Sequence, residues 1–261
     1  MFDTITVLGG RGKDGTAEPV SRVDFRMGDV VTIVGPTGSG KTTLINDIEL
    51  LAAGNTPTGR SVLFDGAPAP ALFYNNPSHH PIALITQHTT FLSDMPVGDF
   101  LRVHAQIRSL GQSKIEQLVE ETLQFANQLT GEPISFDSRM TELSGGQTRA
   151  LLIADAAIIC ATPIVLLDEV ENAGIHRAKA IELLRRYRKI FLFVTHDPRI
   201  ALFSDYRIVM RAGQMVDVLS TNDNERALSV QVGRLDDALS TLRERIRSGF
   251  QLSRNELEGI V

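Results

Sequence analysis

The stretch Gly35-Pro36-Thr37-Gly38-Ser39-Gly40-Lys41-Thr42, which follows the apolar run Val30–Val34, decides the fold. It matches the pattern G-x-x-x-x-G-K-[ST] and lies between a predicted strand and a predicted helix over Leu44–Ala52. Its glycines let the backbone wrap around a polyphosphate, so that N–H groups and the helix N-terminus face the phosphate oxygens. The pattern therefore predicts a phosphate-binding loop. The alternative is a glycine turn followed by an exposed lysine.

Two side chains of this loop have distinct predicted roles toward a nucleotide. Lys41 supplies a mobile positive charge for the β- and γ-phosphates, and the hydroxyl of Thr42 is placed to ligate Mg²⁺. The predicted ligand is Mg-ATP. The predicted nucleotide-binding set in this loop consists of Gly35, Pro36, Thr37, Gly38, Ser39, Gly40, Lys41, Thr42 and Thr43.

A second apolar run ends in two carboxylates, in the stretch Ile164-Val165-Leu166-Leu167-Asp168-Glu169. Such a run is typical of a buried strand that delivers acids to the ligand-binding edge of a sheet. Asp168 is expected to hold Mg²⁺, and Glu169 to polarise the water that attacks the γ-phosphate. Taken alone, the pattern is equally typical of a strand that ends in exposed acids. The phosphate loop upstream favours the functional interpretation.

Further apolar runs, bounded by turn residues, recur along the chain and suit strands buried on both faces of a largely parallel sheet. Helical patterns fall between them, for example over Arg177–Arg188, which predicts an α/β fold with crossover helices. The predicted strands are Val30–Val34, Val62–Phe64, Ile82–Ile85, Ile164–Leu167, Ile190–Val194 and Arg207–Met210.

The pattern over Val97–Ile159 is different, because it is helical with few strand signals. We therefore predict a mostly parallel α/β ATP-binding core over 1–96 and 160–219, with an inserted helical subdomain over 97–159. A polar linker at Ser220–Asn224 precedes a C-terminal helical appendage within 220–261. An amphipathic helix packed on its own domain is the simpler interpretation of this tail, and a dimer or partner contact is the alternative.

The stretch Leu143-Ser144-Gly145-Gly146-Gln147 resembles the signature LSGGQ of the ATP-binding cassette (ABC) family. Physically it is a second phosphate-binding helix start, in which the Ser144 hydroxyl and the N–H groups of Gly145 and Gly146 can contact a γ-phosphate. The resemblance implies a P-loop NTPase of ABC type, in which that phosphate belongs to ATP on the opposite subunit. A serine-glycine turn that caps a helix is the alternative for this fragment alone.

Two more positions match the same family. Gln87, after the strand Ile82–Thr86, looks like the glutamine that touches Mg²⁺ and the attacking water. His196, after the run Phe191–Thr195, looks like the histidine that contacts the γ-phosphate. Alone, each is a polar residue at a strand end, and a lone histidine is more often structural than catalytic. Their order and context favour function. The predicted catalytic set is Glu169, His196 and Gln87, and the predicted Mg²⁺ ligands are Thr42, Gln87 and Asp168.

The chain departs from the family pattern at three places, one of which is the C-terminal tail described above. Upstream of the phosphate loop, Leu8–Gly15 is a glycine-rich basic loop without the usual aromatic residue that stacks on adenine, so Arg11 is a candidate to stack instead. After Glu169, the stretch Val170–Ile175 lacks the usual proline, and Ile175 replaces an aspartate. This stretch resembles a run found in soluble cassette ATPases that activate another enzyme. The resemblance favours a role outside transport. His79-His80 lacks cysteine or acidic neighbours, so no metal is assigned there.

Composition sets the remaining limits. The chain has 261 residues, 43% of them hydrophobic, and a net charge of −5, so nucleic acid is not an expected partner. Cys160, the single cysteine, lies in an apolar run and is interpreted as a small buried hydrophobe. No stretch is apolar enough to span a bilayer, and the chain start does not resemble a signal peptide. We expect a cytoplasmic protein, with peripheral attachment to the inner face of the membrane as the alternative.

These features predict an ATP hydrolase that works at a head-to-tail dimer interface with a second copy or a homologous ABC subunit. The partner that it drives is either a membrane permease or a soluble enzyme or complex. A nucleotide-dependent binding switch with little turnover is the alternative from a different class of function.

Overall fold

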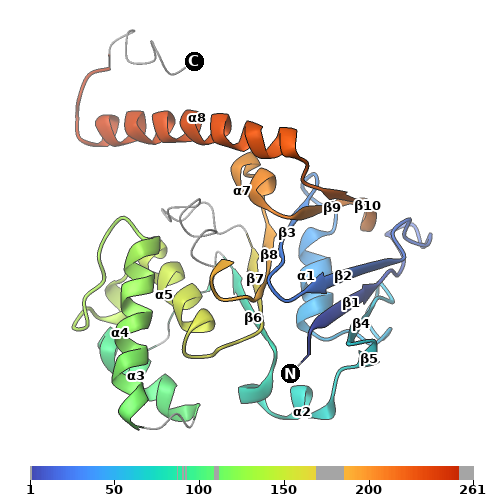
Figure 1. The fold of residues 1–261 in the computed structure, drawn as a ribbon, viewed down its shortest axis with the longest axis horizontal. Helices are drawn as coiled ribbons and strands as arrows, with labels where there is room; N and C mark the ends of the chain where they lie inside the picture. The colour runs from blue at the N-terminus through green and yellow to red at the C-terminus, as the bar shows by residue number, and fades with distance from the viewer. Residues whose placement is uncertain are drawn as a thin grey trace.

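The computed structural model describes residues 2–86, 88–89, 91, 93–108, 112–168 and 185–252. Within them lie two β-sheets, shown in Figure 1. The six-stranded sheet has the order β10-β9-β3-β8-β7-β6, and the four-stranded sheet has the order β2-β1-β4-β5. The strands are β1 (Thr4–Leu8), β2 (Arg22–Arg26), β3 (Val30–Val34), β4 (Ser61–Phe64), β5 (Ala67–Pro68), β6 (Ile82–Thr86), β7 (Ile164–Asp168), β8 (Ile190–Val194), β9 (Tyr206–Arg211) and β10 (Gln214–Ser220).

The six-stranded sheet is parallel from β6 to β9, and only β10 runs antiparallel, as a hairpin with β9. Four or five residues of β3, β7 and β8 are buried in succession, as expected of strands covered on both faces. The α/β fold with a mostly parallel sheet is thereby confirmed. The assignment of Val62–Phe64 to this parallel sheet is wrong, because β4 pairs antiparallel with β1 and buries only alternate residues. A three-residue apolar run is too short to reveal that alternation.

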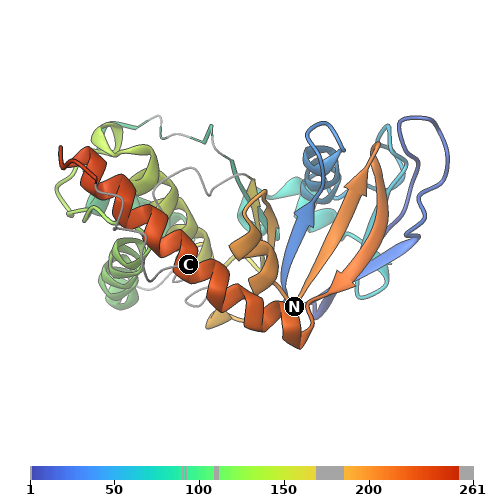
Figure 2. The same ribbon diagram turned by 90° about the horizontal axis from the view of Figure 1, so that it is seen from above.

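Alternate residues of the central strands face two different apolar clusters. Val165, Leu167 and Phe193 belong to one cluster, which they share with α3 (Val97–Ile107), α4 (Gln112–Leu129) and α5 (Gly145–Ala157). Leu166 and Leu192 belong to the other, which includes α1 (Lys41–Glu49) and the four-stranded sheet. Figures 1 and 2 show the three helices gathered on one side of the sheet and α1 on the other. Because successive side chains of a strand point to opposite faces, the core has two layers, one on each face of the sheet.

The start of α1 differs from its prediction. The helix begins at Lys41, directly after Gly40, rather than at Leu44. It ends before Leu51, a non-glycine residue with φ of 52°. The predicted helix over Arg177–Arg188 lies largely outside the described residues. The division into core, helical subdomain and appendage remains a prediction, although α3, α4 and α5 all fall within 97–159.

The C-terminal part forms α7 (Pro198–Phe203) and the long helix α8 (Asp223–Arg247), which crosses one end of the molecule in Figure 1. Part of the predicted polar linker is the start of α8, because Asn222 and Glu225 exchange side-chain to backbone hydrogen bonds as a capping box. Helix α8 packs on α7, where Arg199 pairs with Asp236 and Asp237. Its opposite side exposes a stripe of Leu228, Leu235, Leu239 and Ile246.

The remaining short helices are α2 (Ala71–Asn75), η1 (Pro77–His79) and η2 (Met140–Glu142). Among the residues that the structure describes, none of the helices combines the length and the apolar character that crossing a bilayer requires.

Candidate functional site

The predicted phosphate loop joins β3 to α1, and its glycines have conformations that other residues adopt with strain. Gly35, Gly38 and Gly40 have φ values of 152°, 76° and 98°. A Cβ on Gly35 would lie 2.3 Å from the carbonyl oxygen of Met210 in β9, so the loop also packs too closely there for a side chain. The backbone path of this loop therefore depends on glycine at Gly35 for both conformation and space.

The side chains of the loop that are predicted to face a nucleotide lie at the start of α1. Lys41 is buried, and its Nζ donates to the carbonyl oxygens of Gly35 at 2.9 Å and of Pro36 at 3.2 Å. Thr42 and Thr43 are exposed in the first turn of the helix. The helix N-terminus adds a partial positive charge and backbone N–H groups beside them. The arrangement combines a buried cation with an exposed hydroxyl, which suits a phosphate and its counter-ion.

The turn between β9 and β10 packs against this loop. The N–H of Gly213 donates to the carbonyl oxygen of Ser39 at 2.8 Å, and a Cβ on Gly40 would lie 2.8 Å from the Cα of Gly213. Lys13, from the glycine-rich loop after β1, donates from Nζ to the carbonyl oxygen of Gly38 at 2.8 Å. Gly213 was not predicted, because the turn pair Ala212-Gly213 is its only signal in the sequence. The contact of Lys13 with the phosphate loop was not predicted either.

A buried ionic network fixes the position of these segments. The guanidinium of Arg60, at the start of the segment that leads into β4, contacts Glu18 with Nη2–Oε1 at 2.6 Å and Nε–Oε2 at 3.0 Å. It also contacts Asp47 of α1 at 2.9 Å and the carbonyl oxygen of Gly213 at 2.8 Å. All three charged side chains are at most 4% exposed. Burial lowers the pKa of Arg60, but its hydrogen bonds with both carboxylates outweigh burial and raise it.

Glu18 extends the same network to the backbone. Its carboxylate accepts from the N–H groups of Gly10 at 2.7 Å and of Met215 at 2.6 Å. Arg60 therefore links the basic loop after β1, helix α1 and the β9–β10 turn, which are the three segments around the phosphate loop. Nothing in the local sequence around Arg60 indicates that it is buried, because its partners are distant in the chain.

The carboxyl ends of β6, β7 and β8 align at one edge of the sheet. Thr86 pairs in register with Asp168, and Asp168 pairs with Val194. Asp168 is half-buried, and His196, two residues beyond Val194, is exposed. Gln87 and Glu169 lie outside the described residues, as does the stretch 170–175. The register nevertheless brings the ends of the three strands that precede the predicted catalytic residues to the same edge, next to β3 and its phosphate loop.

The predicted signature begins α5, with Ser144 as its N-cap. The Oγ of Ser144 accepts from the N–H of Gln147 at 3.3 Å, and Oε1 of Gln147 accepts from the N–H of Ser144 at 2.9 Å. Ser144 and Gly145 are exposed. A capping hydroxyl that accepts still carries its own O–H as a donor. The helix start is therefore a capping box, which agrees with the alternative interpretation of a serine-glycine turn that caps a helix. It is also an exposed group of donors at a positive helix end.

Three further observations concern residues that the sequence singled out. Arg11 donates to the carbonyl oxygen of Gly15 within its own loop. His80 contacts the carbonyl oxygen of Ile82 through Nδ1. Cys160, interpreted from sequence as an inert buried hydrophobe, instead lies beside His104 and Asp155, and this cluster is described below.

The parallel sheet, its phosphate loop at the start of α1 and a second capped helix start on the far face define a nucleotide-binding domain of the P-loop class. The sequence profile of the family described as "ABC transporter" matches residues 20–172. The chain belongs to this ABC family, and it is an ABC-type ATPase that binds ATP.

Similar proteins agree with this assignment. An uncharacterized ABC transporter ATP-binding protein of Methanocaldococcus jannaschii is 45% identical over 98% of this chain and 97% of its own length. A sulfate/thiosulfate import ATP-binding protein of Agrobacterium fabrum is 30% identical over 91% of this chain and 69% of its own length.

Solved structures share the fold at lower identity. CbiO1 of Clostridium perfringens, part of the ABC transporter complex CbiONQ, has a TM-score of 0.64 at 20% identity and covers 96% of this chain and 100% of its own. A dimeric ATP-binding cassette in a post-hydrolysis state with ADP and Pi has a TM-score of 0.61 at 20% identity. It covers 84% of this chain and 99% of its own.

Proposed function

We propose that this chain is the ATP-hydrolysing subunit of an ABC transporter and that it acts as a head-to-tail dimer. The observation that carries the proposal is the placement of its two phosphate-binding helix starts. Helix α1 and helix α5 belong to apolar clusters on opposite faces of the same sheet. A phosphate held by Lys41 of one chain would therefore meet Ser144 and Gly145 of a second chain rather than those of its own.

Hydrolysis would follow from the residues at the sheet edge. Lys41 and the backbone N–H groups of the loop would bind and orient the triphosphate, and the partner's signature helix would exclude water from its other side. Glu169 would orient and deprotonate the attacking water, and His196 would donate to the γ-phosphate. Gln87 would hold the same water.

Mg²⁺ fits the oxygen donors available here. Thr42 offers an exposed hydroxyl and Asp168 a half-buried carboxylate at the strand end, which are hard ligands of the kind this ion prefers. Gln87 would be a further oxygen ligand. When bound, Mg²⁺ would neutralise charge on the phosphate oxygens. The chain's own residues would position the triphosphate and the attacking water.

The substitution Glu169→Gln tests this proposal. Loss of the base is expected to lower phosphate release by about 100-fold or more, while ATP still closes the dimer. Sedimentation with Mg-ATP should then show a stable dimer of Glu169→Gln. Glu120→Gln, an exposed acid on α4, is the matched control and should behave like the native chain. Unchanged phosphate release in Glu169→Gln would contradict the assignment of Glu169.

The partner is proposed to be a membrane permease, because relatives over nearly the full chain are named as ABC transporter or import ATP-binding proteins. A soluble enzyme or complex is the second candidate, favoured by the unusual stretch Val170–Ile175. Affinity purification of the tagged chain from its native host separates the two candidates. A polytopic membrane protein in the complex supports the permease, and a soluble complex without one supports the second candidate.

A further inference from the structure

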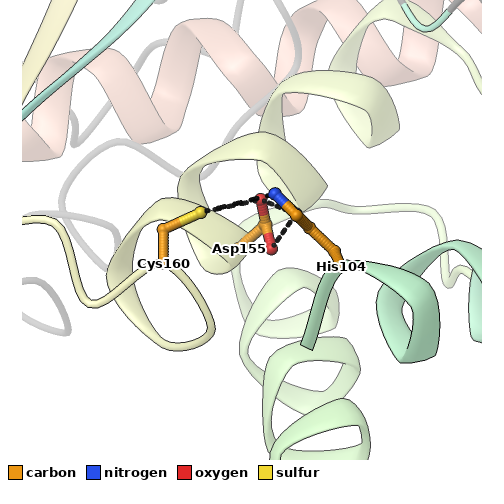
Figure 3. Close-up of side chains that lie close together, drawn as sticks. All are labelled: His104, Asp155 and Cys160. Atoms are coloured by element: carbon orange, nitrogen blue, oxygen red, sulfur yellow. Dashed lines mark hydrogen bonds and ion pairs between the residues drawn. The ribbon is translucent and has the colours of Figure 1, made fainter. Parts of the chain in front are cut away.

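Three side chains with different donor atoms meet at the far end of the signature helix, as Figure 3 shows. His104 comes from α3, Asp155 from the last turns of α5, and Cys160 from the turn that follows α5. His104 Nδ1 lies 2.9 Å from Oδ2 of Asp155, and that oxygen lies 3.5 Å from Sγ of Cys160. One donor atom from each residue fits within 4.8 Å of the other two. The phosphate-binding residues are not part of this cluster.

The fold holds this cluster in place. The N–H of Cys160 donates to the carbonyl oxygen of Asp155 at 2.9 Å, which closes the turn, and Ala161 follows with a left-handed φ of 47°. The buried Lys189 donates from Nζ to the carbonyl oxygens of Thr162 at 2.7 Å and of Ala156 at 3.4 Å, on the two sides of the turn. The positions of the Asp155 and Cys160 backbones are therefore fixed before any ion binds.

The cluster is shielded but accessible. The side chain of Asp155 is 8% exposed, whereas that of His104 is 28% exposed, and Cys160 is half-buried. His104 is therefore the ligand through which the cluster borders the solvent.

We propose that His104, Asp155 and Cys160 form a binding site for a divalent transition metal ion, Zn²⁺ being the best match. Imidazole and thiolate donors favour Zn²⁺ over Mg²⁺ or Ca²⁺, which prefer oxygen. Bonds of about 2.0–2.3 Å place neighbouring donors of a tetrahedral site roughly 3.3–3.7 Å apart. The Sγ–Oδ2 distance of 3.5 Å falls in this range, whereas the hydrogen-bonded Nδ1–Oδ2 distance of 2.9 Å is shorter and the distance of 3.9 Å from Sγ to the other ring nitrogen, Nε2, is longer. The carboxylate and the thiolate together balance the ion's charge, and water supplies the fourth ligand.

Cobalt(II) titration of the full-length chain without nucleotide tests the site directly. Because Cys160 is the only cysteine in the chain, any thiolate-to-cobalt charge-transfer band must come from it. The proposal predicts such a band, saturating at one equivalent and abolished by Zn²⁺. Ions bound weakly at the phosphate loop cannot produce this band, because that loop has no sulfur.

Substitutions and thermal melting complete the test. Cys160→Ser should abolish the band, and His104→Gln should weaken Co²⁺ binding by at least about 10-fold. His79→Gln, an exposed histidine outside the cluster, should bind like the native chain. Zn²⁺ at 100 times its dissociation constant should raise the native Tm by about 5–10 °C and leave the Tm of Cys160→Ser unchanged.

Melting in chelator shows whether each variant folds, so a loss of binding can be separated from a loss of structure. An absent charge-transfer band in the folded native chain would overturn the proposal. Equal Zn²⁺-induced Tm shifts in the native chain and Cys160→Ser would also overturn it. In either case the cluster would be an ion pair between His104 and Asp155 with a neighbouring thiol.

Discussion

Arg60 and Glu18 form a two-point ion pair with 0% exposure of either side chain, and the same guanidinium contacts Asp47 of helix α1. Through Gly10, Gly213 and Met215, this network reaches the segments on which the phosphate loop rests. The proposed nucleotide-binding loop thus rests on segments that a buried ionic network holds together. We therefore expect the intact Arg60 network to be needed for both folding and ATP binding.

Arg60→Met is expected to destabilise the chain by about 3–5 kcal/mol, because it leaves Glu18 and Asp47 buried without their cation. Chemical denaturation measures this change. Arg22→Met removes an arginine whose pair with Asp24 is exposed, and it should leave the denaturation midpoint unchanged. Equal effects of the two substitutions would show that the buried network is not needed for stability.

Gly35→Ala is expected to abolish measurable ATP binding, since its Cβ would lie 2.3 Å from a backbone oxygen of β9 and the residue has a left-handed φ. Gly59→Ala is the matched control, with φ of 68° but no atom within 4 Å of the added Cβ. It should cost only the backbone strain, about 1 kcal/mol, and keep ATP binding. Calorimetric titration with ATP distinguishes the two. Native-like affinity in Gly35→Ala would mean that the loop can shift away from β9.

Lys189 should give the fold a distinct pH dependence. Burial lowers its pKa from 10.5 to about 8, so the folded chain disfavours the charged form. Below pH 8 both the folded and the unfolded state are protonated, and the cost of burying the charge is fully present. Between about pH 8 and 10.5 the unfolded state binds more protons, so the free energy of unfolding rises with pH.

Between about pH 8 and 10.5, the free energy of unfolding of the native chain should therefore rise by about 1–3 kcal/mol relative to that of Lys189→Met. Denaturation midpoints measured at several pH values for both proteins provide the difference. Lys114→Met, at an exposed position on α4, controls for the loss of a lysine side chain as such. A constant gap between the native chain and Lys189→Met would show that Lys189 stays charged throughout.

Local sequence patterns predicted those parts of the fold that depend on interactions between neighbouring residues in the chain. The stretch Gly35–Thr42 predicted a loop between a strand and a helix, because glycine conformations and helix starts depend on neighbours in the chain. The runs in β3, β7 and β8 were recognisable because strands covered on both faces are continuously apolar.

Other features depend on residues far apart in the sequence. Arg60 meets Glu18, 42 residues away, and Gly213, 153 residues away, so no local pattern reveals its burial. Cys160 looked inert because its apolar neighbours do not show that α3 brings His104 to it. The antiparallel sheet was missed because β2 and β4 are short and bury only alternate residues, while β5 has two exposed residues.

The central claim is that each ATP lies between the phosphate loop of one chain and the signature helix of another. Two inactive variants, Lys41→Ala and Ser144→Arg, test it by mixing. The first loses the buried cation that is proposed to bind phosphate, and the second places a bulky side chain at the exposed helix start. Each alone is expected to reduce phosphate release by about 100-fold or more.

In an equal mixture, half of the dimers should contain one chain of each kind, and each of these has one complete site and one doubly defective site. Phosphate release should recover to roughly a quarter of the native rate when one complete site suffices for turnover. A mixture that releases phosphate only at the average rate of the two separate variants would contradict it.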